Sequence, residues 1–253
     1  MNAHRNRVQR RVLLAAITAM ISLPMAASAQ AGGPGFLFHR PMMSFGIRVG
    51  YARPQTGSEV FDFARNILTL GTSDFASAAW GADLAIRATE RLDIAAGVGL
   101  TRSSTRSEFR DWVDIDDLSI EQTTTFLRVP MTLSAKYYFR DRGRSVSQFV
   151  WVPERWSPYV GVGGGAVWYR FEQEGDFLDF ETLDVFNAFL DSEGTTGTAH
   201  VFSGVDLSLS PRMVLTGEAR YSWASTDMGR DFVDFDGIDL GGFQATLGLS
   251  VRF

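Results

Sequence analysis

The chain has 253 residues, of which 24 are basic, 29 are acidic and none is cysteine. Without cysteine, an exported chain has no disulfide scaffold, so its fold must be held by backbone hydrogen bonds and packing. The formal net charge of −5 argues against nucleic acid as a partner.

The first 29 residues have the layout of a cleaved secretory signal peptide. Four arginines precede the apolar run Val12–Ala27, which ends in the small residues Ala27-Ser28-Ala29. The run is shorter than the roughly 20 residues that a membrane-spanning helix needs. We therefore predict cleavage after Ala29, followed by a flexible N-terminal segment over residues 30–42. Loss of four of the 24 basic residues leaves 20 against 29 acidic ones, a net charge of −9.

Eight later segments alternate apolar and polar residues with the period of two that a β-strand requires. The alternation is clearest in the last of them, where six apolar residues are separated by Gln, Thr, Gly, Ser and Arg. Their lengths suit tilted strands that cross a membrane. In chain order the segments are Phe45–Tyr51, Trp80–Arg87, Leu92–Leu100, Phe126–Phe139, Tyr159–Tyr169, Val201–Leu209, Leu215–Trp223 and Phe243–Phe253.

The connections between these segments alternate in length. Turns are predicted at residues 88–91, 140–157 and 210–212, and long loops at residues 54–76, 103–123, 172–197 and 224–241. No run of 18 apolar residues follows the signal peptide, so strands that span a membrane must close into a barrel. The sequence therefore predicts an eight-stranded antiparallel up-and-down barrel over residues 43–253 in the bacterial outer membrane, with short periplasmic turns and long extracellular loops.

Two of the long loops contain apolar residues at helical spacing. Phe61, Ile67 and Leu68 in the first loop, and Phe186 and Phe189 with Leu190 in the third, predict short amphipathic helices over the barrel mouth. Exposed apolar clusters of this kind are also typical of contact surfaces. A partner at the extracellular loops is the alternative interpretation.

The polar positions of the strands separate a membrane barrel from a secreted soluble one. A lipocalin-like barrel would turn its apolar residues inward around a ligand. Ionisable residues of both signs on the polar face instead indicate a narrow polar lumen. The predicted lumen charges are Arg48, Asp83, Arg87, Asp93, Arg128, Lys136, Asp206, Glu218, Arg220 and Arg252.

Aromatic residues are predicted to gather at both ends of the strands. Amphipathic rings prefer the headgroup levels of a bilayer, and a soluble barrel has no reason to place them there. The predicted outer girdle is Tyr51, Trp80, Trp168, Tyr221 and Trp223, and the predicted periplasmic girdle is Tyr137, Phe139, Tyr159 and Phe253.

Three stretches resemble the small outer-membrane barrels of the OmpA and OmpW kind. They are Leu127-Arg128-Val129-Pro130-Met131-Thr132-Leu133 with the following Lys136-Tyr137-Tyr138-Phe139, Tyr159-Val160-Gly161-Val162-Gly163-Gly164-Gly165, and the terminal Leu249-Ser250-Val251-Arg252-Phe253. The resemblance covers about residues 43–253. It implies that Phe253 is the signal read by the outer-membrane assembly machinery. It says little about function, because this fold supports pores, adhesins, enzymes and anchors.

The sequence offers little catalytic machinery beyond the signal peptide. His39 precedes the first strand without a plausible partner, and His200 and Ser203 lie on opposite faces of one strand. We interpret His200 as an outer-rim residue bonded to loop acids, and predict neither an enzyme nor a cofactor. Acidic residues in the third and fourth loops could hold divalent cations that bridge to lipopolysaccharide. Acids that simply stay solvated and repel each other are the favoured explanation, and no metal ligands are predicted.

The leading functional hypothesis is a structural or surface-interaction protein of the outer membrane, because eight strands leave a lumen that side chains can fill. Lipid, lipopolysaccharide and the assembly machinery are its expected partners. The alternative is a small OmpW-like channel for small or apolar solutes. A barrel enzyme and a soluble lipocalin-like binder are the remaining alternatives.

Overall fold

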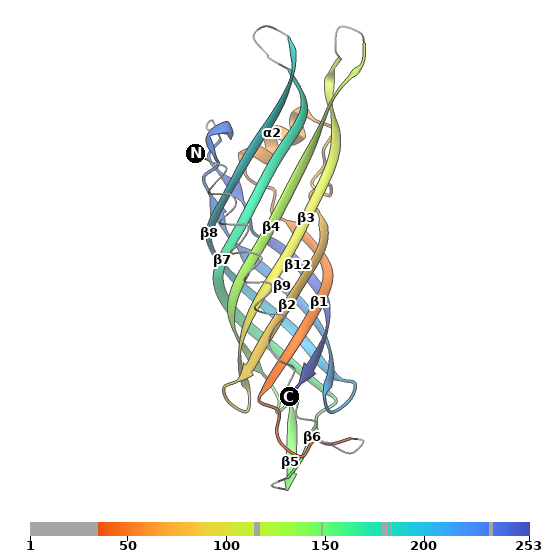
Figure 1. The fold of residues 1–253 in the computed structure, drawn as a ribbon, viewed down its shortest axis with the longest axis vertical. Helices are drawn as coiled ribbons and strands as arrows, with labels where there is room; N and C mark the ends of the chain where they lie inside the picture. The colour runs from red at the N-terminus through yellow and green to blue at the C-terminus, as the bar shows by residue number, and fades with distance from the viewer. Residues whose placement is uncertain (1–34, 114–116, 148, 179–181, 183, 233–234) are drawn as a thin grey trace, which may run out of the picture. The chain divides into compact units, whose positions relative to one another are not determined.

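A computed structural model describes residues 35–113, 117–147, 149–178, 182, 184–232 and 235–253. Within them, eight antiparallel strands close into a barrel in the order β1-β12-β9-β8-β7-β4-β3-β2 (Figure 1). The predicted fold class is therefore confirmed. The barrel strands are β1 (Met43–Pro54), β2 (Ser77–Arg87), β3 (Leu92–Val113), β4 (Ser119–Tyr138), β7 (Trp156–Leu178), β8 (Val185–Ser208), β9 (Met213–Trp223) and β12 (Gly242–Arg252).

The period of two in the sequence becomes the two faces of the barrel wall. On β1, Ile47 and Val49 are exposed outside, while Arg48 lines the lumen. On β12, Leu247 is 63% exposed and the neighbouring Thr246 is buried. The chain closes by pairing its first strand with its last, from Ser44 opposite Arg252 to Pro54 opposite Gly242.

Four strands are much longer than the sequence predicts. β3, β4, β7 and β8 have 22, 20, 23 and 24 residues, so the expected loops at residues 103–123 and 172–197 are largely strand. The ladder between β4 and β7 continues to the pair Gln122 and Gly175. Outside the membrane, the outward face no longer requires apolar residues, so the alternation fades while the hydrogen bonds continue.

The helix predicted around Phe186, Phe189 and Leu190 is also wrong, because these residues belong to β8. The ring of Phe186 stacks on that of Phe177, its partner across the ladder with β7. A cross-strand pair of aromatic rings stabilises a strand by up to about 1 kcal/mol. A short isolated helix has no such partner and is only marginally stable in water. The spacing of the apolar residues alone did not distinguish a helix from a strand in this segment.

The helix predicted in the first loop is confirmed as α2 (Glu59–Ile67). Its first turn carries Glu59 and Asp62 and its last turn Arg65, which suits the helix dipole. The apolar face, with Val60, Phe61 and Ala64, is buried. Figure 1 shows α2 at the end of the barrel where the long hairpins project, which we call the outer end.

We call the opposite end the periplasmic end. Its longest connection, between β4 and β7, is more than the turn that the sequence predicts. The segment between β4 and β7 forms a hairpin of β5 (Gly143–Ser147) and β6 (Val150–Pro153), which lies below the barrel in Figure 1. Two backbone hydrogen bonds of 2.9 and 2.8 Å join Leu37 to Trp151 of β6. Part of the segment 30–42, predicted to be flexible, thus makes defined contacts. Whether residues 1–29 are a cleaved signal peptide lies outside the described residues.

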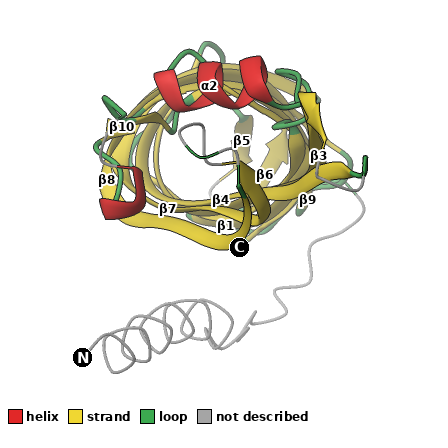
Figure 2. Ribbon diagram, turned by 90° about the horizontal axis from the view of Figure 1, so that it is seen from above, coloured by secondary structure: helices red, strands yellow, loops and turns green. Residues whose placement is uncertain are grey.

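The fourth outer connection holds small elements only. β10 (Ser225–Thr226) pairs with β11 (Ile238–Asp239), and η1 (Arg230–Phe232) lies between them in the chain. Viewed from above, the helices lie over the rim of the ring (Figure 2). None of the helices in the described residues is long and apolar enough to cross a membrane.

Candidate functional site: a charged lumen closed at both ends

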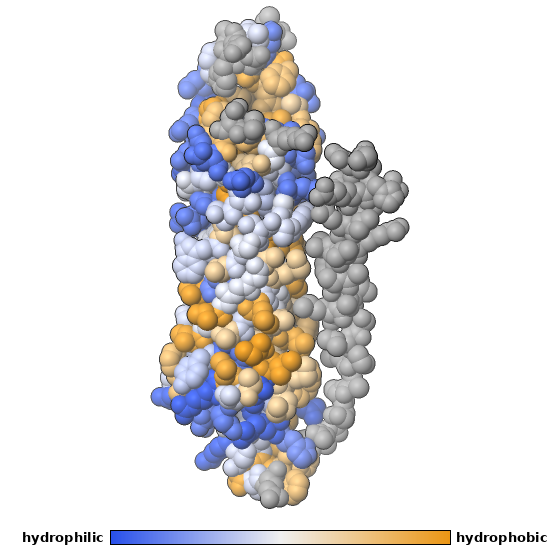
Figure 3. Space-filling view, turned by 90° about the vertical axis from the view of Figure 1, so that its left-hand side faces the viewer, coloured by the Kyte–Doolittle hydropathy of each residue, from blue (hydrophilic) through white to orange (hydrophobic). Residues whose placement is uncertain are grey.

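The outside of the barrel is apolar over its membrane-spanning part. Exposed aliphatic side chains occur on successive strands, such as Ile47, Ile94, Leu133, Val162 and Leu249. On the face shown in Figure 3, apolar side chains form a band that ends in a hydrophilic rim toward the periplasmic end. A soluble protein does not leave such a belt in water. The barrel therefore spans a membrane, and closed barrels of this kind lie in the bacterial outer membrane.

Most of the predicted girdle residues point outward. Tyr51, Trp80, Tyr137, Phe139 and Trp223 are each 45–58% exposed. Tyr221 packs edge-on against Trp223 at 4.9 Å, and Trp168 carries the guanidinium of Arg170 at 5.7 Å. The placement of Tyr159 on the outside was wrong. It is 1% exposed inside the lumen, where its hydroxyl donates to Glu218 at 3.0 Å.

All ten predicted lumen charges line the inside of the barrel, and seven of them, together with Arg142, form four ion pairs. Nitrogen to oxygen distances are 3.0 Å for Arg48 to Asp83, 3.2 Å for Lys136 to Asp206 and 2.9 Å for Arg220 to Glu218. Asp93 pairs with Arg142, a lumen residue that the sequence did not indicate. Arg142 follows β4 in what was read as a turn, so strand parity could not place it.

Lys136 is the centre of the most connected of these pairs. Its ammonium lies 3.6 Å from the centroid of the Tyr159 ring and 5.1 Å from that of Tyr138. Asp206 also accepts hydrogen bonds of 2.8 Å from the hydroxyls of Tyr138 and Thr216. Both charges are thus desolvated and fully engaged, which makes the pair costly to break.

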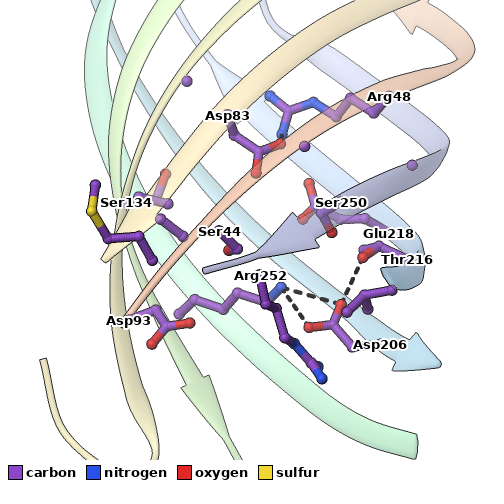
Figure 4. A pocket seen from close by; sticks show the side chains of 18 of the residues that line it. Ser44, Arg48, Asp83, Asp93, Ser134, Asp206, Thr216, Glu218, Ser250 and Arg252 are labelled. Atoms are coloured by element: carbon purple, nitrogen blue, oxygen red, sulfur yellow. Dashed lines mark hydrogen bonds and ion pairs between the residues drawn. The ribbon is translucent and has the colours of Figure 1, made fainter. Parts of the chain in front are cut away.

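Two chambers lie inside the described part of the barrel. The lower chamber, toward the periplasmic end, has a volume of about 70 Å³, and acids and bases from several strands point into it (Figure 4). The upper chamber has a volume of about 60 Å³. Arg48, Thr132 and Arg220 line both. In the upper chamber, Arg128 donates to the backbone carbonyls of Leu240 and Gly241 at 2.8 and 2.9 Å.

An apolar cluster fills the outer end above these chambers. Phe61 of α2, which is fully buried, meets the rings of Phe75, Phe126 and Phe171 at centroid distances of 4.8, 5.6 and 6.0 Å. Residues from the outer connections complete the layer. The whole cluster is Val60, Phe61, Ala64, Leu68, Leu70, Phe75, Phe109, Ile120, Phe126, Val167, Tyr169, Phe171, Leu178, Phe232, Ile238 and Leu240.

The periplasmic end is filled by a tryptophan and three arginines. Trp151 of β6 is 1% exposed, and the guanidiniums of Arg87 and Arg252 lie 5.7 and 5.8 Å from its ring centroid. Arg142 is buried beside them over the ring of Tyr138 at 4.5 Å. Trp151 could not be assigned from the sequence, since it lies on a hairpin outside the barrel wall.

His200 was predicted to lie at the outer rim among the loop acids, and this prediction is wrong. The residue lies in the lumen. It is 2% exposed, and one ring nitrogen is 2.9 Å from the hydroxyl of Ser134 on β4. A Cβ at Gly163 would lie 2.6 Å from His200, so the glycine makes room for the ring. Ser203 is exposed on the opposite face of β8, as predicted. The contact with Ser134 joins strands that are far apart in sequence, which parity alone does not reveal.

The acidic outer residues are partly engaged by neighbouring side chains. Arg170 pairs with Glu193 at 2.7 Å and with Glu172 at 3.5 Å, and Asn187 donates to Asp176 at 3.0 Å. Among the described residues, no three His, Asp or Glu side chains converge as a metal site would require.

No protein-family model matches the sequence, and no match is found among curated proteins. Among solved structures, the N-terminal barrel domain of Pseudomonas aeruginosa OprF is 13% identical, with 85% of this chain and 100% of that chain covered and a TM-score of 0.38. Yersinia pestis Ail, in complex with the heparin analogue sucrose octasulfate, is 13% identical over 84% and 99%, with a TM-score of 0.40. E. coli outer membrane protein W is 17% identical over 85% and 99%, with a TM-score of 0.33. At this similarity, the role of the chain has to be derived from its own residues.

Proposed function

We propose that this outer-membrane barrel acts through its surface and as a structural element of the envelope, and that its lumen does not conduct. The observation that carries the proposal is that three layers of side chains fill the barrel one after another along its axis. An apolar cluster lies at the outer end, four ion pairs lie in the middle and Trp151 with its arginines lies at the periplasmic end. An ion that crosses would have to displace all three.

The proposal predicts electrical silence. Refolded mature protein, shown by its heat-dependent gel mobility to be a closed barrel, should give no reproducible conductance steps in a planar bilayer. The same preparation with a porin added serves as the positive control for the membrane. Reproducible steps from the barrel alone would support the OmpW-like channel instead and would contradict a filled lumen.

A specific surface supports the interaction role. β8 pairs with β9 only as far as Ala199, so its outer part extends beyond its neighbour. Between Val185 and Leu190, no described strand pairs with this edge of β8. Phe186 and Phe189 are 49% and 54% exposed there. An open apolar edge is a template for an extended segment of another protein, which adds to the sheet as a further strand.

Charge at this edge should block strand addition. Peptides of extended, β-branched sequence, selected by phage display on cells that carry the barrel, should lose at least about tenfold in affinity when Phe189→Lys is introduced, because a charge on an edge strand opposes pairing. Phe63→Lys, at an exposed phenylalanine of α2 and not on a strand edge, is the matched control and should have no effect. Equal binding to both variants, or selected peptides without extended character, would contradict the edge as the site.

The remaining partner predictions are part of this proposal. The outer connections are rich in acids, so a polyanion such as the heparin analogue bound to Ail is not the ligand expected here. Lipid contacts at the apolar belt follow from the exposed side chains. Phe253 is 52% exposed at the end of the barrel wall, an accessible position for the assembly signal that the family resemblance implies.

A further inference from the structure

The lower chamber has more bases than acids. Its lining includes six basic residues and four acidic ones, a formal excess of two positive charges. The bases are Arg48, Arg87, Lys136, Arg142, Arg220 and Arg252, and the acids are Asp83, Asp93, Asp206 and Glu218. Each acid is paired with one base, which leaves Arg87 and Arg252 without a carboxylate in contact among the described residues.

Both of these arginines are buried. Arg87 is 9% exposed and Arg252 is 7% exposed. The Nε of Arg87 has no hydrogen-bond partner in the described part of the chain, and the same holds for the Nε of Arg142 beside it. Arg252 donates to the hydroxyl of Ser208 at 3.1 Å and forms no ion pair with a described carboxylate. Guanidiniums removed from water without a counter-charge are strongly unfavourable.

The two arginines line the same chamber from strands that are separated by one strand. Arg87 ends β2 and Arg252 ends β12, and β1 is the single strand between them. Strands lie about 4.8 Å apart, so the two backbones are roughly 10 Å apart at this level. Both side chains converge on the ring of Trp151, and Ser44 of β1 points into the chamber between them.

From this geometry, we propose that the lower chamber binds one small oxyanion of the phosphate or sulfate class between Arg87 and Arg252. An anion with two negative charges cancels the excess of two positive charges. The planar guanidinium presents paired N–H groups that match tetrahedral oxyanions. The chamber of about 70 Å³ exceeds the roughly 10–15 Å³ that one water needs, and is large enough for such an ion.

A bridging water is the competing occupant. Arg87 lies opposite Asp93 in the β2–β3 ladder, and Oδ1 of Asp93 has no hydrogen-bond partner in the described residues either. Water between these atoms would satisfy both without any anion. A bridging water would leave the excess of two positive charges in place. Added anion should therefore stabilise the barrel if the site binds an oxyanion, and should not if a water occupies it.

The test is thermal unfolding of the refolded full barrel in maltoside detergent, with phosphate or sulfate replacing gluconate at constant ionic strength. The oxyanion site predicts a saturable rise in the unfolding temperature, and calorimetric titration with phosphate should give one ion per barrel. No saturable effect would leave only the bridging water and would overturn the proposal. An equal rise with chloride would mean charge screening and would overturn the oxyanion assignment.

Variants locate the site. Arg87→Gln and Arg252→Gln should each weaken phosphate binding by at least about tenfold, the loss expected for a charged hydrogen bond. Each removes an unpaired buried charge, so the barrel should fold at least as well in anion-free buffer. Arg144→Gln, on the exposed part of β5, is the matched control and should keep full binding. Undiminished binding in both lumen variants would overturn the proposal.

The choice of detergent also distinguishes a free oxyanion from the phosphate of a lipid headgroup. Maltoside micelles contain no phosphate, so a response there identifies a free ion. A response that appears only after phospholipid is added would assign the arginines to a lipid headgroup and would overturn the free oxyanion site.

Discussion

Lys136→Met should lower the free energy of unfolding by about 3–5 kcal/mol, the range for breaking a buried ion pair by removing one partner. The side chains of Lys136 and Asp206 are only 15% and 6% exposed. Removal of the ammonium leaves the carboxylate of Asp206 charged in a closed lumen, held only by the hydroxyls of Tyr138 and Thr216. Urea-induced unfolding in lipid vesicles, followed by tryptophan fluorescence, measures the loss.

The double variant Lys136→Met with Asp206→Asn should recover most of this loss. The asparagine is neutral. Its oxygen accepts a hydrogen bond from one of the two hydroxyls, and its amide nitrogen donates to the oxygen of the other, where Asp206 accepts from Tyr138 and Thr216 with separate oxygens. Arg106→Met is the control for a solvated pair, because Arg106 is 71% exposed and pairs with Glu121 above the membrane. It should cost less than about 1 kcal/mol. If the double variant is as unstable as Lys136→Met alone, the loss comes from packing and not from charge.

Phe61→Ala should open the outer end of the barrel while leaving the membrane part closed. The ring is fully buried and meets three other aromatic rings, so its loss costs about 3–5 kcal/mol within the apolar cluster. The cluster is built from side chains of the outer connections and outer strand ends, and the ladder of the barrel does not depend on it. We expect faster hydrogen exchange in residues 55–76 and an unchanged heat-dependent gel shift.

The matched control for this variant lies on the same helix. Phe63 is 47% exposed, and Phe63→Ala should leave hydrogen exchange in the first outer connection close to that of the parent protein. Similar exchange in the two variants would mean that α2 is not held by its buried face. A loss of the gel shift in Phe61→Ala alone would mean that the outer cluster supports the whole barrel.

Some of the residues that close the lumen could be predicted from the sequence, and others could not. Arg48 and Asp83 could be placed inside from strand parity, because a strand has only two faces. Their pairing follows from the register between β1 and β2, in which Arg48 lies opposite Gly81 and Gly46 lies opposite Asp83. Trp151 and Arg142 carry no such signal, since a hairpin outside the wall has no parity relative to the lumen. The periplasmic layer was therefore missed.

The sequence by itself determined the number of barrel strands, their membrane-spanning faces and all ten predicted lumen charges. It could do so because lipid and lumen impose a strict alternation on every residue between them. Only the tertiary structure decided how far β3, β4, β7 and β8 extend beyond the membrane, because water accepts polar residues on either face. It also decided which charges pair, since partners such as Lys136 and Asp206 lie on strands that meet only when the ring closes. Contacts across a closed lumen depend on the whole ring, so no local pattern predicts them.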